Sequence, residues 1–221
     1  MLEANKSAWF ATIFDAYNRN LLRRRFAALN LDGGQNLVPG TDPTIIVANH
    51  SSWWDGLVCY HLLRRSGTDL FVFMADENLR KYPLFRRLGA FSIDRSNSRD
   101  ALRSLDYAAR LATEKRDRSF LIFPQGKIEP ANQKRLHFET GVIRLIDRLA
   151  PCRVVNLALR YTFRNDFKPE IFAAASSPLD FSAAPAKTAI GGLEEGLTAA
   201  LDAIDHDLAS ENLERFQDCL H

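Results

Sequence analysis

The chain has 221 residues, of which 46% are hydrophobic, 10% aromatic and 25% charged, and its formal net charge is +2. This composition is that of an ordinary globular domain and excludes a largely disordered chain, while so small a net charge gives no argument for a nucleic-acid partner. No segment reaches the roughly 20 consecutive apolar residues of a transmembrane helix, and residues 1–6 lack the basic start of a secretory signal. We therefore expect a cytoplasmic protein, and without clustered metal-ligand residues we expect no metal or redox cofactor.

The first predicted element is an amphipathic helix from Ser7 to about Leu31. Its apolar residues recur at helical spacing and are followed by three consecutive arginines, Arg23 to Arg25. Two interpretations stay open. The helix can lie in a bilayer interface, where arginines attract anionic headgroups by about 1 kcal/mol each, or it can pack on the core with its arginines solvated. We assign residues 1–31 to this helix and residues 32–221 to the main domain.

Beyond a polar turn region at residues 31–43, buried strands alternate with helices. Strands are predicted at residues 44–48, 70–74, 90–93, 119–123 and 154–161, and helices at residues 57–63, 76–88, 100–114, 138–149 and, with polar interruptions, 193–220. This alternation predicts a single α/β domain whose mixed, mostly parallel central sheet is flanked by helices and preceded by the N-terminal amphipathic helix.

His50 and Asp55 form the first candidate site. They lie between the predicted strand at residues 44–48 and the helix that continues through residues 57–63, so they belong to the carboxyl edge of the sheet, where α/β proteins collect ligands. Residues five apart on an ideal helix point about 140° apart. We therefore expect His50 to precede the helix, with Ser51 or Ser52 as its N-cap. A histidine oriented by an aspartate is suited to act as a general base.

Arg95 is the second candidate, at the end of the predicted strand 90–93. A guanidinium group suits bidentate recognition of phosphate or carboxylate. The simpler alternative is a surface ion pair with Asp94 or Asp100.

Gln125, Gly126 and Lys127 follow the predicted strand 119–123. Glycine permits a ligand to approach the backbone closely, and the lysine adds a positive charge. The simpler alternative is an ordinary turn. Three strand ends thus offer a base, an arginine and a polar glycine turn.

In the order and spacing of these segments the chain resembles the glycerolipid acyltransferase family, typified by lysophosphatidate acyltransferases. His50 to Asp55 resembles the catalytic His-x4-Asp block of that family, residues 89–95 its Gly-x-x-Phe-Ile-Asp-Arg block, residues 123–126 its Phe-Pro-Glu-Gly block, and residues 154–158 stand in place of its fourth block. The resemblance spans residues 44 to 162. It implies an O-acyltransferase that moves a fatty acyl group from acyl-CoA or acyl-carrier protein to a hydroxyl of a lysophospholipid or other lipidic acceptor.

The third and fourth blocks depart from the family pattern. Gln125 replaces the usual glutamate and Lys127 the usual threonine, Ile128 and Glu129 stand where arginine and serine are common, and Asn156 replaces the usual proline. Because the third block helps to hold the acceptor in relatives, these changes indicate an acceptor other than lysophosphatidate.

The resemblance implies a mechanism in which His50 takes the proton of the acceptor hydroxyl while Asp55 orients the imidazole. Arg95, Gln125, Gly126 and Lys127 would then bind substrate, with backbone N–H groups near Gly126 stabilising the oxyanion. The alternatives are a thioester hydrolase, which would activate water instead, and a non-enzymatic lipid-binding protein on the same scaffold. Basic residues around the site favour a peripheral position on the inner face of the cell membrane.

Overall fold

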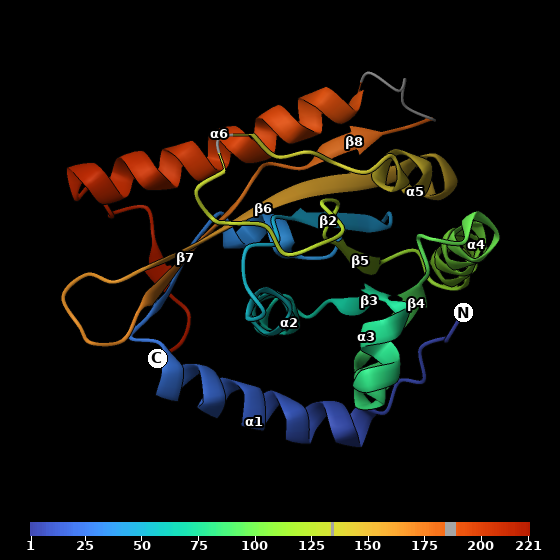
Figure 1. Cartoon of the computed structure of the whole chain (residues 1–221), viewed down its shortest axis with the longest axis horizontal. Helices are drawn as coiled ribbons and strands as arrows, with labels where there is room; N and C mark the ends of the chain where they lie inside the picture. Colours follow the sequence, from blue (N-terminus) through green and yellow to red (C-terminus); the bar gives the residue numbers. More distant parts are fainter. Residues whose placement is uncertain (134, 184–188) are drawn as a thin grey trace.

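The computed structural model describes residues 1–133, 135–183 and 189–221 (Figure 1). Within them, nine strands form one sheet in the order β4-β3-β5-β2-β6-β7-β1-β9, with β8 paired to β6. The strands are β1 (Leu29–Asp32), β2 (Thr44–Ala48), β3 (Asp69–Ala75), β4 (Ala90–Ile93), β5 (Arg118–Ile122), β6 (Cys152–Thr162), β7 (Glu170–Ala175), β8 (Leu179–Phe181) and β9 (Gln217–Asp218).

Pairing is parallel from β4 through β3, β5 and β2 to β6 and again between β1 and β7, whereas β7 and β8 run antiparallel to β6, and β9 antiparallel to β1. The five residues of β2 are all buried, as expected for a central strand covered on both faces. The predicted α/β domain with a mixed, mostly parallel sheet is confirmed.

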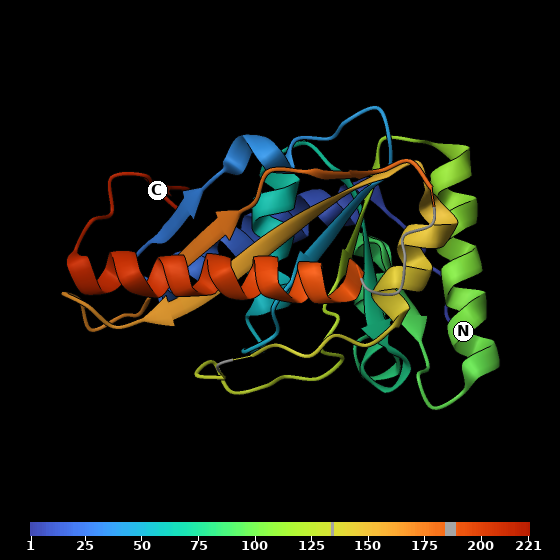
Figure 2. The same ribbon diagram turned by 90° about the horizontal axis from the view of Figure 1, so that it is seen from above.

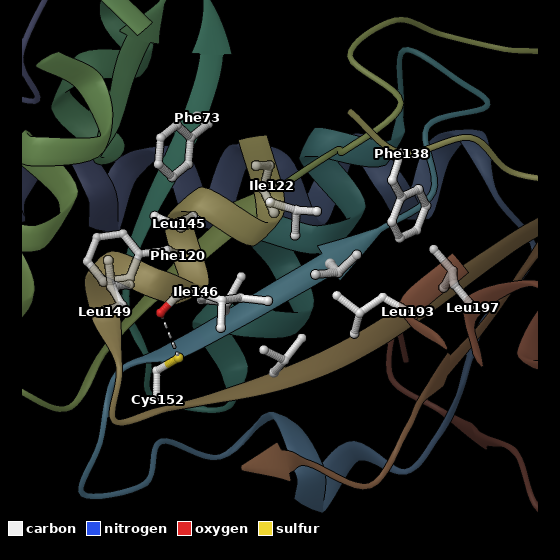
Figure 3. Close-up of a cluster of buried hydrophobic side chains, with 14 of the residues drawn as sticks. Phe73, Phe120, Ile122, Phe138, Leu145, Ile146, Leu149, Cys152, Leu193 and Leu197 are labelled. Atoms are coloured by element: carbon white, nitrogen blue, oxygen red, sulfur yellow. Dashed lines mark hydrogen bonds between the residues drawn. The ribbon is translucent and has the colours of Figure 1, made fainter. Parts of the chain in front are cut away.

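Helices cover both faces of the sheet. They are α1 (Ala8–Arg25), α2 (Asp55–Arg65), α3 (Asp76–Lys81), α4 (Ser98–Glu114), α5 (Gly141–Leu149) and α6 (Ala189–Ser210), with short 3-10 helices η1 (Gly34–Leu37) and η2 (Pro83–Leu88). Buried side chains of α4, α5 and α6 form one core cluster against the sheet, part of which Figure 3 shows. A second cluster packs α1 and α2 against the other face.

Figures 1 and 2 place α1 and α6 on opposite sides of the sheet. In Figure 2 the described residues between β5 and α5, 123–133 and 135–140, run along the edge of the sheet where β2 and β6 end. That edge carries the candidate site.

Several predicted boundaries are wrong. The N-terminal helix ends at Arg25, and residue 31 lies inside β1, which pairs with β7. The predicted helix 76–88 is divided, because Pro83 lacks an N–H and disfavours the helical conformation at Tyr82. The C-terminal helix ends at Ser210, and β9 follows it. Strands β7 and β8 were not predicted.

Candidate active site

His50 and Asp55 form a hydrogen-bonded pair at the carboxyl end of β2. Nδ1 of His50 lies 2.9 Å from Oδ2 of Asp55, whose side chain is fully buried, while the imidazole is 22% exposed. His50 precedes α2 and Asp55 is its first residue, as the sequence predicted. With a hydrogen on Nδ1, the ring leaves Nε2 as a proton acceptor, and among the described residues Nε2 has no hydrogen-bond partner.

Asp55 also holds the turn that leads into α2. Its Oδ2 accepts hydrogen bonds from the backbone N–H of Ser51 (2.7 Å) and of Ser52 (2.8 Å). The expected serine N-cap is therefore wrong, because the residue before the helix is Trp54 and the carboxylate of Asp55 reaches back to satisfy the turn. Three N–H donors on one oxygen fix the carboxylate rigidly beside His50.

The other oxygen of Asp55 has a partner that the sequence did not reveal. Tyr161, near the end of β6, donates its hydroxyl to Oδ1 of Asp55 at 2.6 Å. Burial of the hydroxyl, followed by the neighbouring Asp55 charge, raises the pKa of Tyr161 well above its ordinary value. The tyrosine therefore stays protonated and acts as a donor at physiological pH. A tyrosine in a predicted strand carries no signal that its ring meets a residue 106 positions away.

The backbone of His50 is held from the segment that follows β5. Its N–H donates to Oε1 of Gln125 at 2.6 Å, and its carbonyl accepts from the N–H of Glu129 at 2.9 Å. The imidazole stacks on Phe123 with ring centroids 4.3 Å apart. Residues of the third block thus surround His50.

Gln125 lies beneath His50 and does not face open solvent. It is 5% exposed, and its Nε2 donates to Oε2 of Glu129 at 2.7 Å while its Oε1 accepts from His50. Both ends of the amide are therefore engaged within the protein. This geometry argues against the predicted substrate contact of Gln125, because its amide already makes hydrogen bonds to His50 and Glu129.

Arg95 and Gly126 meet, which brings the second and third blocks together. Gly126 has a φ of +72°, a conformation that favours glycine, and a Cβ at this position would overlap the guanidinium of Arg95. The N–H of Gly126 itself donates to the Phe123 carbonyl at 3.0 Å, so an oxyanion role stays a prediction for the other backbone N–H groups near this turn.

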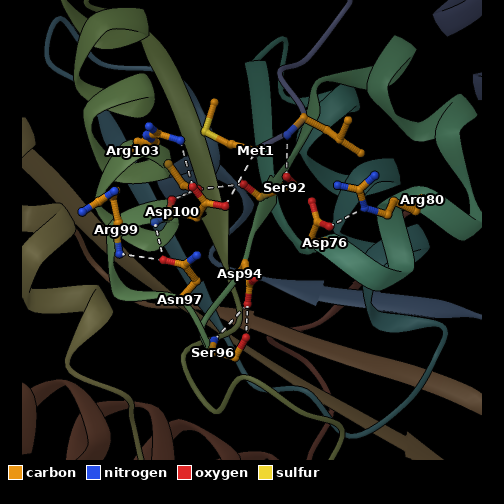
Figure 4. Close-up of polar contacts among 12 residues, drawn as sticks. Met1, Asp76, Arg80, Ser92, Asp94, Ser96, Asn97, Arg99, Asp100 and Arg103 are labelled. Atoms are coloured by element: carbon orange, nitrogen blue, oxygen red, sulfur yellow. Dashed lines mark hydrogen bonds and ion pairs between the residues drawn. The ribbon is translucent and has the colours of Figure 1, made fainter.

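The simpler account of Arg95 as an ion-pair partner is not supported. Figure 4 shows Asp94 bonded to Ser96 at the start of α4 and Asp100 bonded to Arg103. Neither aspartate has an ion pair with Arg95 in the part of the chain that the structure describes. The guanidinium is exposed beside the Gly126 turn and free to receive an anion.

Lys127 extends into solvent. Its side chain is 72% exposed, and its Nζ lies 3.5 Å from Oε1 of Glu129. It therefore places a positive charge next to Glu129, and among the described residues it makes no hydrogen bond to His50.

A pocket of about 310 Å³ adjoins the Asp55 side of the site. Aromatic side chains make most of its wall, and its lining residues are Arg25, Phe26, Ser52, Trp54, Tyr161, Phe163 and Pro169. Tyr161 thus lines this pocket and also donates its hydroxyl to Asp55.

The chain is similar to a known protein family. The profile described as Acyltransferase matches residues 30–160, which include His50, Asp55, Arg95 and the segment from Gln125 to Lys127. No curated protein sequence gives a significant match. The chain belongs to the Acyltransferase family.

The fold also has a solved counterpart. The 1-acyl-sn-glycerophosphate (LPA) acyltransferase PlsC from Thermotoga maritima superposes with a TM-score of 0.64 over 87% of this chain and 79% of that chain, at 16% sequence identity. At this identity the likeness concerns the fold. In residues 1–133, 135–183 and 189–221, no helix combines the length and apolar content that crossing a bilayer requires.

Proposed function

We propose that the protein is an O-acyltransferase that moves a fatty acyl group from an acyl thioester to the hydroxyl of a lysophospholipid or other lipidic alcohol. The observation that carries this proposal is the His50–Asp55 pair, whose Nε2 remains open beside a cationic turn. Membership of the Acyltransferase family supports the reaction class. The donor is acyl-CoA or acyl-carrier protein.

The pair acts as a general base without a covalent enzyme intermediate. Nε2 of His50 takes the proton of the acceptor hydroxyl while the oxygen attacks the thioester carbonyl, and Asp55 stabilises the imidazolium that forms. When the tetrahedral intermediate collapses, the carbon–sulfur bond breaks and the imidazolium returns the proton to the leaving thiolate. The products are an ester and a free thiol.

Arg95 and Lys127 supply the positive charge of the site. Arg95 follows β4 and its guanidinium lies against Gly126, whereas Lys127 is on the segment that Gln125 and Glu129 attach to His50, and both side chains are exposed. We assign them to an anionic group of either substrate, such as the phosphate of a lysophospholipid or of CoA. Gly126 contributes to this subsite because it has no side chain, so that Arg95 can lie close to its backbone.

The N-terminal helix supports a membrane-surface location. Trp9, Ile13 and Tyr17 are 63%, 60% and 58% exposed and recur every four residues on one face of α1. The opposite face packs through Leu22 and through Asn18, which donates to the Leu57 carbonyl at 3.0 Å. The packed face fits the interpretation of a helix on the core, and the exposed apolar face supports the proposal that the helix also lies in a bilayer interface. We place the protein peripherally on the inner face of the cell membrane.

The reaction is tested by identifying its product. Purified protein is incubated with labelled acyl-CoA, or labelled acyl-carrier protein, and a lipid extract of the host, and all labelled species are identified by mass spectrometry. A new acyl ester supports the proposal and names the acceptor. Release of free fatty acid alone would instead assign a thioester hydrolase, and an unchanged thioester would favour a non-enzymatic lipid-binding role.

A further inference from the structure

Gln125 and Glu129, two of the departures from the family pattern, form one closed hydrogen-bonded unit with His50. The His50 N–H donates to Gln125 Oε1 (2.6 Å), the Gln125 Nε2 donates to Glu129 Oε2 (2.7 Å), and the Glu129 N–H donates to the His50 carbonyl (2.9 Å). Gln125 is 5% exposed and the Glu129 side chain 12%. Both backbone groups of His50 are thereby fixed.

The hydrogen bonds of this unit require both departures from the family pattern, the glutamine at position 125 and the glutamate at position 129. The bond at 2.7 Å between positions 125 and 129 needs a donor on one side and an acceptor on the other. With the usual glutamate at position 125, its buried carboxylate would lie beside that of Glu129, and the two like charges would repel each other. A serine at position 129, beside Gln125, would remove the carboxylate that satisfies the buried amide. In this chain the carboxylate is thus at position 129 and the amide at position 125, where the family pattern has the carboxylate at position 125.

We infer that Gln125 and Glu129 are a coupled pair of positioning residues that set the place of His50 at the end of β2. They act through the backbone of His50, while recognition of the anionic group is left to Arg95 and Lys127. The consequence for catalysis rests on the proposed function. The consequence for the structure of His50 does not, so the two can be tested separately.

The structural arm measures hydrogen exchange of the His50 amide by NMR in four proteins: the wild type, Gln125→Glu, Glu129→Ser and the double variant Gln125→Glu/Glu129→Ser. We expect exchange to accelerate by about 10-fold or more in each single variant, because each leaves a buried polar group unsatisfied or repelled. In the double variant, a carboxylate at position 125 accepts the His50 N–H unopposed, so protection returns toward that of the wild type.

The controls are Gln133→Glu and Glu139→Ser, which make the same chemical changes at exposed positions of the same segment. They are expected to leave the His50 amide unchanged. Thermal unfolding identifies any variant that has lost its fold. Effects of the two single changes that simply add in the double variant, or single variants with wild-type exchange, would overturn the inference.

The catalytic arm separates positioning from substrate binding. We expect kcat to fall by about 10- to 100-fold in Gln125→Glu and to recover in the double variant, with the KM for each substrate changing by less than about threefold. A change confined to the acceptor KM would show that Gln125 binds substrate, and would overturn the positioning role. If the wild type shows no acyl transfer, the proposed function fails, and the exchange data still decide whether the pair positions His50.

Discussion

Asp55 holds more groups of the site in place than its spacing from His50 suggested. Its fully buried carboxylate accepts hydrogen bonds from two backbone N–H groups, the His50 ring and the Tyr161 hydroxyl. These donors hold the carboxylate in a fixed orientation, as a group must be held to orient a catalytic histidine. Tyr161 is therefore the residue whose removal probes this support without touching the base itself.

Tyr161→Phe is expected to lower kcat by about 5- to 50-fold and the free energy of unfolding by about 1–2 kcal/mol, because Oδ1 of Asp55 loses its donor inside the protein. The measurement is steady-state kinetics together with urea unfolding. Tyr82→Phe, which removes a hydroxyl from an exposed ring, is the matched control. A Tyr161→Phe enzyme with wild-type kcat would show that Asp55 does not need this hydrogen bond.

Gly126→Ala tests the contact between Arg95 and the turn at Gly126. The new Cβ would displace the guanidinium of Arg95, and the φ of +72° would strain an alanine by about 1–2 kcal/mol. We expect the KM of the anionic substrate to rise by about 3- to 10-fold. Gly141→Ala is the control, since its Cβ would meet no atom within 4 Å. Equal kinetics in the two variants would argue against a binding role of Arg95.

Among the residues of the site, the sequence predicted those whose partners are close in the chain. His50 and Asp55 are separated by four residues, and the general geometry of a strand followed by a helix places them together. Tyr161 was missed because its contact spans 106 positions. Gln125 could be named as a candidate from the sequence, but its orientation depends on Glu129 and on the His50 backbone, which only the folded chain brings together.

The central strands were predictable as elements because burial on both faces gives them continuous apolar runs. Strand β7 was missed although its last five residues are buried, since three of its six residues are alanines and the run lacks the β-branched character typical of strands. Strands β8 and β9 have only three and two residues. Such strands owe their pairing to neighbours in space.

Helix α2 contains a titratable group whose burial makes stability depend on pH. His61 is 1% exposed, and its Nε2 lies 3.3 Å from the Cys219 carbonyl next to β9. Burial, the leading cause, lowers the pKa of His61 below its ordinary value. The unfolded chain therefore binds the proton more readily, and folding loses free energy as the pH falls through the range near about 6.5, where an unfolded histidine titrates.

The measurement is urea unfolding at pH 7.5 and pH 5.0 for the wild type and for His61→Leu. We expect the wild type to lose more stability on acidification than the variant, which has no group to protonate at this position. His206→Leu, at an exposed position of α6, serves as the control. Equal losses in the wild type and in His61→Leu would contradict this account of His61.

At the scale of the whole molecule, the site follows from topology. His50, Arg95 and Gln125 come just after β2, β4 and β5, and Tyr161 lies near the end of β6, all parallel strands whose carboxyl ends share one edge of the sheet. Ligands bind at this edge in open α/β sheets. The sequence predicted all four strands and assigned site residues to the ends of three of them, and the spatial order of the strands came from the structure.

The exposed strip of α1 makes a prediction about the location of the whole protein. Vesicles containing anionic lipid should carry the protein on flotation, and neutral vesicles should carry much less, because apolar insertion and arginine attraction act together. Replacing Trp9, Ile13 and Tyr17 by serine should reduce flotation by about 10-fold or more. Leu102→Ser, an exposed apolar position on α4, is the control. Equal, negligible flotation on both kinds of vesicle would contradict membrane docking.

Acyl transfer by His50→Ala tests most directly whether His50 is the base. The variant should keep the unfolding temperature of the wild type within a few degrees and form ester product at least about 100-fold more slowly, because it lacks the imidazole nitrogen that takes the acceptor proton. His137→Ala, an exposed histidine in the segment before α5, should leave the rate unchanged. A folded His50→Ala protein that makes ester at nearly the wild-type rate would contradict the central claim that His50 is the base.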